Sequence, residues 1–208
     1  MEFSGEFETH ITVRFTPSED IVDLKAWAKA HGMKCLHILL DRGEAPSQPM
    51  LTHWGKGSLS QQKAIAESLC QDLTSAGFTV TRLKMEGSPE NEDVPQSPMD
   101  AARHPLERHF EHHLKLLLTP AADISSLTDI AQQHHAHLSR NALRTRSDAY
   151  QERFVTQRCC GVGLPEARQQ LEALVTALTI QGYRILEVEQ EFVVYDTNLA
   201  LDAGWLNT

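Results

Sequence analysis

A Glu-x-His pair occurs twice in the chain, once as Glu8 and His10 and once as Glu111 and His113. A carboxylate beside an imidazole can orient the ring and raise its basicity, and both effects suit proton transfer or anion binding. Two imidazoles on opposite sides of a cleft can act as a general base and a general acid. These four residues are therefore the first candidates for a functional site.

The residues around the first pair alternate between apolar and polar types, which predicts a strand with one buried face. Because successive side chains of a strand point to opposite sides, the apolar side chains from Phe7 to Val13 would face the helices. The opposite, open face would carry Glu8, His10, Thr12 and Arg14. In the second half of the chain, the corresponding open-face residues are Glu111, His113 and Lys115.

Further polar residues could complete a site for a small anion. Lys34 and Arg158 add positive charge near the same face, and Lys115 can hold a phosphoryl oxygen as a point charge. Thr52 and Thr156 could donate hydrogen bonds, although threonine is also simply a good strand residue. We therefore predict binding of a small, phosphate-containing anion in a cleft between the two open faces, by Glu8, Glu111, Lys34, Lys115, Thr52, Thr156 and Arg158.

The segment His10-Ile11-Thr12-Val13 resembles the H-x-[ST]-hydrophobic motif of the two-histidine phosphoesterases. The resemblance implies hydrolysis of cyclic phosphodiesters or RNA ends, with His10 and His113 as the acid and base and Thr12 as part of the first motif. The second half departs from the pattern, because Lys115 stands where the family has Ser or Thr. Catalysis by His10, His113 and Thr12 is therefore the second functional hypothesis.

A structural role is the third hypothesis for the Glu-x-His pairs. The histidines could be buried hydrogen-bonding residues at an interface between the two halves, since polar networks are often structural. The open faces could instead be covered by a partner or by a second copy of the chain in a homo-oligomer. We expect His10→Ala to lower stability under this hypothesis, because a buried partner would lose its hydrogen bond.

Two clusters of histidines resemble metal ligands but lack the required geometry. His109 and His113 have the spacing of zinc ligands on a helix, whereas we predict a strand from Phe110 onward. The cluster His134, His135 and His137 has neither a cysteine partner nor a carboxylate at a characteristic spacing. We therefore predict no metal site and no cofactor.

Composition limits the partners of the protein. The formal net charge is −9 and the sequence pI is about 5.6, so the chain should repel phosphate backbones and bulk nucleic-acid binding is not expected. No apolar run approaches the roughly 20 residues that span a bilayer, and membrane association is not expected. The acidic segment Met1–Glu6 lacks the apolar core of a signal peptide, which predicts a cytoplasmic protein.

The two halves of the chain resemble each other well beyond the Glu-x-His pairs. Phe7 corresponds to Phe110, and His31 corresponds to His134. Within these two segments other positions are also identical, such as Leu24 and Leu127 in the predicted helices. Farther along, Thr52, Gly77 and Glu86 match Thr156, Gly182 and Glu191, with a slightly different offset. A change of offset within a loop is tolerated, so the pattern predicts an internal duplication.

Periodicity and capping signals predict the same elements in each half. In the first half we expect a strand at residues 7–15, a helix from Ile21, strands at 33–40 and 49–54, and a final strand at 78–85. Residues 16–19 read as a helix start with a capping box. Ser58 and Gln61 read as the cap of a second helix, which Gly77 would end.

The order β-α-β-β-α-β is that of the ferredoxin-like unit. The predicted fold class is therefore α+β, with two tandem ferredoxin-like repeats, antiparallel sheets and approximate twofold symmetry. We place the first repeat at residues 1–86, an acidic, proline-rich and extended linker at 87–106, the second repeat at 107–195 and a C-terminal tail at 196–208.

Overall fold

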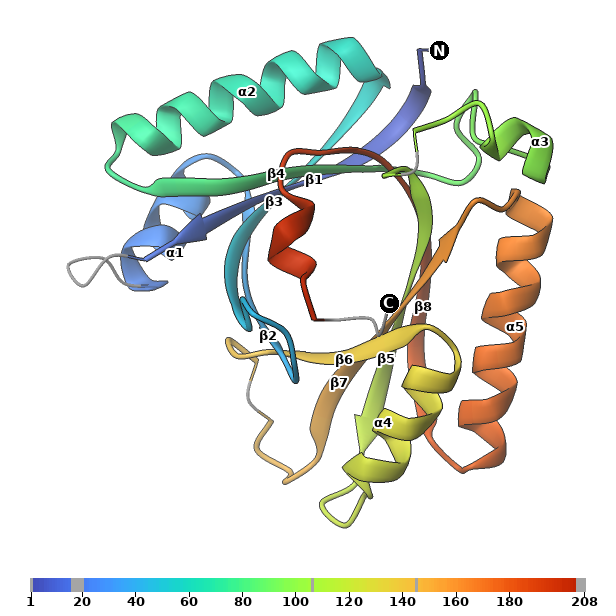
Figure 1. The fold of residues 1–208 in the computed structure, drawn as a ribbon. Coiled ribbons are helices and arrows are strands. Elements are labelled where there is room, and N and C mark those ends of the chain that lie inside the picture. The colour runs from blue at the N-terminus through green and yellow to red at the C-terminus, as the bar shows by residue number, and fades with distance from the viewer. Residues whose placement is uncertain (1, 16–20, 106, 145, 205–208) are drawn as a thin grey trace.

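The computed structural model describes residues 2–15, 21–105, 107–144 and 146–204 (Figure 1). The first half contains β1 (Ser4–Arg14), α1 (Ile21–Ala30), β2 (Lys34–Leu40), β3 (Ser47–Ser58), α2 (Leu59–Ser75) and β4 (Thr79–Gly87). A short helix follows, α3 (Pro98–Ala101). The second half contains β5 (His109–Leu118), α4 (Ile124–Gln133), β6 (Ala136–Asn141), β7 (Gln151–Cys160), α5 (Leu164–Ile180), β8 (Arg184–Asp196) and the 3-10 turn η1 (Leu199–Asp202). The α+β class and the order of the elements agree with the prediction.

The eight strands of the described residues belong to one closed antiparallel barrel, in the order β1-β3-β2-β6-β7-β5-β8-β4. Each half contributes four neighbouring strands, and the two sets have matching orders, β4-β1-β3-β2 and β8-β5-β7-β6. The halves are joined at two seams, where β2 pairs with β6 and β4 pairs with β8.

This closure corrects the expectation of two separate sheets with a cleft between their open faces. At one seam Ile38 to Leu40 pair with Ser139 to Asn141, and at the other Lys84 to Gly87 pair with residues 192–196. An isolated four-stranded sheet would leave the backbone groups of both edge strands unpaired, and closure satisfies part of each edge. The faces expected to be open line the inside of the barrel instead, so they are not a surface for oligomerisation.

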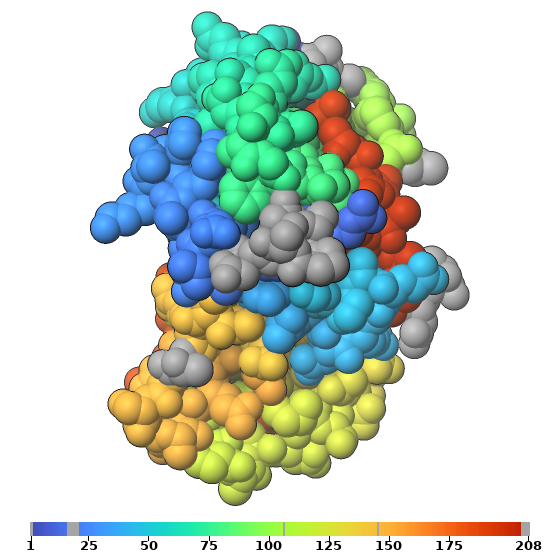
Figure 2. Space-filling model, turned by 90° about the vertical axis from the view of Figure 1, so that its left-hand side faces the viewer, coloured from blue at the N-terminus to red at the C-terminus, as the bar shows by residue number. Residues whose placement is uncertain are grey.

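The helices α1, α2, α4 and α5 lie on the outside of the barrel (Figure 1). They bury the apolar faces of the strands in two clusters, one centred on Ile11, Leu24 and Leu73 and one on Leu114 and Leu127. In Figure 2 the first half lies mainly at one end of the molecule and the yellow and orange part of the second half at the other, while the red C-terminal part lies beside the first half. Among the described helices, none is long and apolar enough to cross a bilayer.

The start of α2 is formed by the predicted capping box. The Gln61 amide donates to Ser58 Oγ at 3.2 Å, and the Ser58 amide donates to Gln61 Oε1 at 3.1 Å. After the helix, Gly77 adopts a φ of +99°, which suits a residue without a side chain. The other predicted capping box, at residues 16–19, lies outside the described residues.

The connection between the halves is more ordered than its composition predicts. The Asn91 side chain donates to the Glu6 carbonyl at 2.7 Å and accepts from the Glu6 amide at 2.9 Å. Val94 is buried, and the connection includes α3. The expected extended and poorly packed linker is therefore wrong for this segment, because local hydrogen bonds to β1 compensate for the charged and proline-rich composition.

Packing of Asn91 against β1 requires a glycine at position 5. A Cβ on Gly5 would lie 1.9 Å from Asn91 Oδ1, and the residue has a φ of +145°. We predict that Gly5→Ala lowers the free energy of unfolding by about 1–3 kcal/mol more than Gly32→Ala does, because overpacking adds to backbone strain. Gly32 is the matched control, since its φ is +66° but nothing lies within 4 Å of its Cβ position. Chemical denaturation would measure both, and equal losses would contradict the prediction.

Candidate functional site

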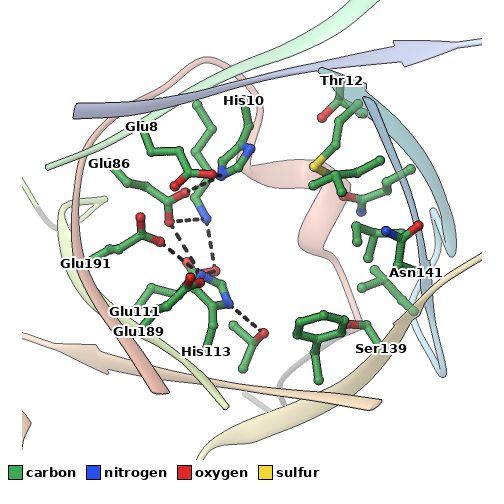
Figure 3. Close-up of a pocket in the computed structure, with 18 of the residues that line it drawn as sticks. Glu8, His10, Thr12, Glu86, Glu111, His113, Ser139, Asn141, Glu189 and Glu191 are labelled. Atoms are coloured by element: carbon green, nitrogen blue, oxygen red, sulfur yellow. Dashed lines mark hydrogen bonds and ion pairs between the residues drawn. The ribbon is translucent and has the colours of Figure 1, made fainter. Parts of the chain in front are cut away.

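The barrel encloses a cavity of about 420 Å³ that is lined by inward-pointing side chains of all eight strands (Figure 3). Glu8, His10 and Thr12 of β1 line it, as the alternation of that strand predicts. Glu111, His113 and Lys115 of β5 line it from the second half. The inside of the barrel is thus largely polar, and the apolar residues of the same strands face the helices.

His10 is held at both ring nitrogens. Its Nδ1 lies 3.0 Å from Thr52 Oγ1 on the neighbouring strand β3. Its Nε2 lies 3.0 Å from Glu86 Oε2 of β4 and 3.6 Å from Glu8 Oε1. Glu8 is itself oriented by the Trp54 indole, which donates to Glu8 Oε2 at 2.9 Å.

His113 has the equivalent set of contacts in the second half. Its Nδ1 lies 3.0 Å from Thr156 Oγ1, and its Nε2 lies 3.3 Å from Glu191 Oε2. It also lies 3.9 Å from Glu86 Oε1. The two imidazoles therefore approach different oxygens of one carboxylate, and Figure 3 shows Glu86 between them.

The surrounding carboxylates favour the protonated form of both imidazoles. Burial lowers the pKa of His10, but the hydrogen bond to Glu86 and the charges of Glu86 and Glu8 outweigh it, so the pKa is raised. For His113, burial acts in the same direction and is outweighed by Glu191, Glu86 and Glu111, so its pKa lies well above the ordinary value. Both rings are thus protonated more readily than a free histidine side chain.

The carboxyl groups of the cavity differ in the direction in which their pKa is shifted. Burial raises the pKa of Glu86, but Lys84 and the two histidines reverse this, so the carboxyl pKa lies well below its usual range. Glu111 is lowered in the same way by Lys84 and Arg158. Glu191 is the exception, because burial and the charge of Glu86 raise its pKa despite the contact with His113.

A chain of buried ion pairs links β4, β5 and β7 beside the histidines. Lys84 Nζ lies 2.8 Å from Glu86 Oε1 and 2.9 Å from Glu111 Oε1. His109 Nε2 lies 3.1 Å from Glu111 Oε2, and Arg158 lies 3.4 Å from the same oxygen. Since Lys84 belongs to the first half and Glu111 to the second, this network joins the two halves inside the barrel.

The C-terminal turn η1 lies within the ring of strands in Figure 1. Its Asp202 receives two hydrogen bonds from Arg82, both at 2.8 Å, and lies 2.7 Å from Arg158. Arg82 also pairs with Asp196. The predicted ligand residue Arg158 is therefore engaged by Asp202 and Glu111, and it is not among the residues that line the cavity.

The other predicted residues occupy different parts of the site. Lys34 lines the cavity, with its Nζ 5.5 Å from the centre of the Trp54 ring. Lys115 lines it as well, at 3.5 Å from Glu152 and 3.6 Å from Glu187. Thr52 and Thr156 are both buried and contact the histidines. The structure thus brings together most of the predicted residues.

The strands β4 and β8 supply charged residues that the sequence analysis missed: Arg82, Lys84, Glu86, Glu187, Glu189 and Glu191. Each strand repeats charged residues at every second position, which is the same signal that identified Glu8 and His10. Glu86 and Glu191 were also matched between the halves. Glu86 and Glu191 contact His113 only because closure of the barrel places β8 between β4 and β5.

The histidine clusters that resemble metal ligands are divided among different partners. His109 contacts Glu111, whereas Nδ1 of His112 lies 2.9 Å from Gln157. His137 is buried, and burial lowers its pKa to about 3. His134 is the C-cap of α4.

Comparison with known proteins gives no family for this chain. No protein-family model and no curated protein matches it. Among solved structures, the small subunit of acetolactate synthase from Thermotoga maritima is similar, at 13% identity and a TM-score of 0.32, over 92% of this chain and 96% of that one. Chlorite dismutase from Candidatus Nitrospira defluvii, in complex with imidazole, gives 13% identity and a TM-score of 0.31, over 92% of both chains. At these TM-scores neither likeness supports an inference about this protein.

The Asp202 contacts predict that the C-terminal turn stabilises the barrel. Asp202→Ala removes the closest carboxylate of Arg158 and one of the two carboxylates of Arg82. Because loss of one partner from a buried ion pair is costly, we expect the free energy of unfolding to fall by about 3 kcal/mol. The matched control is Asp148→Ala, which breaks a surface pair with Arg146 and should cost less than about 1 kcal/mol. Equal effects in urea denaturation would contradict a stabilising role.

Proposed function

We propose that the protein binds a small organic anion inside the barrel. The observation that supports this is the division of one enclosed cavity into a charged part and an apolar part. A volume of about 420 Å³ lies within the range of small-molecule sites. The apolar part is formed by Leu36, Ile38, Leu40, Met50 and Phe154.

The cations of the cavity differ in how firmly they are already paired. Lys84 and Arg82 are buried, and their carboxylate partners lie within 3 Å, so they serve the structure. Lys115 is held at 3.5–3.6 Å by its two glutamates, one of which has an exposed side chain. Arg144 is half exposed and lies 3.6 Å from Glu152. These longer ion pairs of Lys115 and Arg144 can be replaced by contacts to a carboxylate or phosphate.

The proposed ligand is therefore amphipathic. Its acidic group would contact Lys115 and Arg144, which share the partner Glu152, and its apolar body would lie against the apolar wall. A charge-assisted hydrogen bond contributes about 1.5–3 kcal/mol, so each contact to the anion would matter measurably for affinity.

Ligand-dependent stabilisation tests this proposal. We expect hexyl phosphate and hexanoate to raise the melting temperature with increasing concentration, and hexanol to do so less, because binding to the folded state stabilises it. Lys115→Gln should weaken binding of hexyl phosphate about tenfold or more. Lys25→Gln, on the outer helix α1, is the matched control and should leave the affinity unchanged. Absence of stabilisation by both anions would contradict the proposal.

The second candidate is phosphoesterase activity with His10 and His113 as the acid–base pair. It is favoured by the equivalent positions of the two imidazoles on one cavity and by their shared contact with Glu86. Thr12 lies on the same wall. The carboxylates raise the pKa of both imidazoles, which suits the general acid, and the general base would be the neutral form of the other ring.

Hydrolysis of a 2′,3′-cyclic nucleotide tests the second candidate. His10→Ala and His113→Ala should each reduce turnover by roughly 10²–10⁴-fold, as loss of a general acid or base does. His53→Ala is the control, since His53 lies on β3 next to Thr52 but does not line the cavity. No hydrolysis by the unaltered protein, or equal rates in all three variants, would exclude this candidate.

We also propose that the chain arose by internal duplication of a ferredoxin-like unit, with approximate twofold symmetry. Support comes from the repeated order of elements and from the matching strand orders of the two halves. The equivalent contacts of His10 with Thr52 and of His113 with Thr156 add to it, because they repeat the sequence match at the level of single hydrogen bonds.

A further inference from the structure

We propose that Glu86, His113 and Glu191 form a binding site for a divalent transition-metal ion. One ligand atom from each residue can be chosen so that all three lie within 4.8 Å of one another. The residues come from β4, β5 and β8, which are neighbours in the barrel. Figure 3 shows the three side chains pointing toward one another at the charged part of the cavity.

The donor set fits the chemistry of zinc and manganese ions. Such ions accept imidazole nitrogen and carboxylate oxygen at about 2.0–2.2 Å, which places neighbouring donors roughly 3–3.5 Å apart. His113 Nε2 already lies 3.3 Å from Glu191 Oε2 and 3.9 Å from Glu86 Oε1. Small side-chain rotations would therefore bring all three donors to coordination distance without moving the strands.

The buried carboxylate of Glu86 supports the site independently. Its side chain has no exposed surface. His10 Nε2 lies 3.0 Å from Oε2 and Lys84 Nζ lies 2.8 Å from Oε1, so both oxygens face cationic neighbours. A carboxylate oxygen has two lone pairs. Oε1 can therefore bind a metal ion while it keeps its contact with Lys84.

The neighbours of His113 hold its ring in a suitable orientation. Nδ1 is hydrogen-bonded to Thr156 Oγ1 at 3.0 Å. The pKa of His113 is raised, so a metal ion would bind by displacing the proton from Nε2. With Nδ1 donating its hydrogen to Thr156, Nε2 then presents its lone pair toward Glu86 and Glu191. A hydrogen bond at the second ring nitrogen is the usual means by which a ligand histidine is fixed.

The electrostatic surroundings and the access route also suit a cation. A second, more open depression is lined by Glu6, Trp54 and one cation, Lys56, and it shares Glu8, Glu86, Glu189 and Glu191 with the cavity. Carboxylates thus line the way from the surface to the site. Side-chain exposures of 23% for His113 and 14% for Glu191 leave room for water or another small ligand on the metal.

Calorimetric titration of the untagged chain tests the site. After treatment with EDTA, the protein is titrated separately with ZnCl2 and MnCl2 in the absence of any organic anion. We expect one ion of at least one of the two metals to bind per chain. Glu191→Gln and His113→Asn should each weaken this binding by more than about 100-fold. Loss of a residue that only hydrogen-bonds to a metal ligand already lowers metal affinity about 10–100-fold, and these variants remove a ligand itself. Because no organic anion is present, failure of this test would leave the proposed anion binding unaffected.

Glu187→Gln is the matched control, since Glu187 lies on the same strand and faces the same cavity but is outside the group of three residues. It should bind the ion as the unaltered protein does. Circular dichroism and melting in EDTA would show that each variant is folded. As a second measurement, bound Co²⁺ should give a visible absorption spectrum that changes in His113→Asn. Absence of stoichiometric binding, or binding by Glu191→Gln and His113→Asn equal to that of the unaltered protein, would overturn the proposal.

Discussion

Closure of the barrel at the two seams is the constraint on which the rest of the structure depends. Each half alone would be a sheet with one face covered by helices and the other lined with charged side chains. Pairing of β2 with β6 and of β4 with β8 satisfies backbone groups at the edges and encloses the charged faces. Enclosure in turn requires each buried charge to find a partner, because an unpaired ion inside a protein is very unfavourable.

The ion pairs inside the barrel meet that requirement by crossing between the halves. Lys84 joins Glu86 of its own half to Glu111 of the other, and Asp202 joins Arg82 to Arg158. A buried ion pair contributes little net stability compared with apolar packing, although loss of one partner is costly. The network therefore makes the relative placement of the halves specific, and it holds His10 and His113 against the same carboxylate.

This arrangement gives the two ends of the cavity different properties. At one end the carboxylates of Glu86 and Glu191 converge on the imidazole of His113, and the nearby cation Lys84 is firmly paired with Glu86 and Glu111. At the other end, Lys115 and Arg144 have longer contacts and apolar residues form the wall. The proposed cation site and the proposed anion site can therefore coexist in one barrel, because they use different residues.

Local patterns in the sequence determined the elements and the faces of the strands. Alternation around His10 and His113 placed both on the polar face, and the capping box at Ser58 and Gln61 marked the start of α2, because these signals involve residues close together in the chain. The residues of β4 and β8 had the same alternation, but nothing local showed that Glu86 and Glu191 would meet His113. That meeting depends on which strand edges pair. Edge pairing uses backbone groups common to all residues, so only the tertiary structure decided that the two halves close into one barrel with a shared interior.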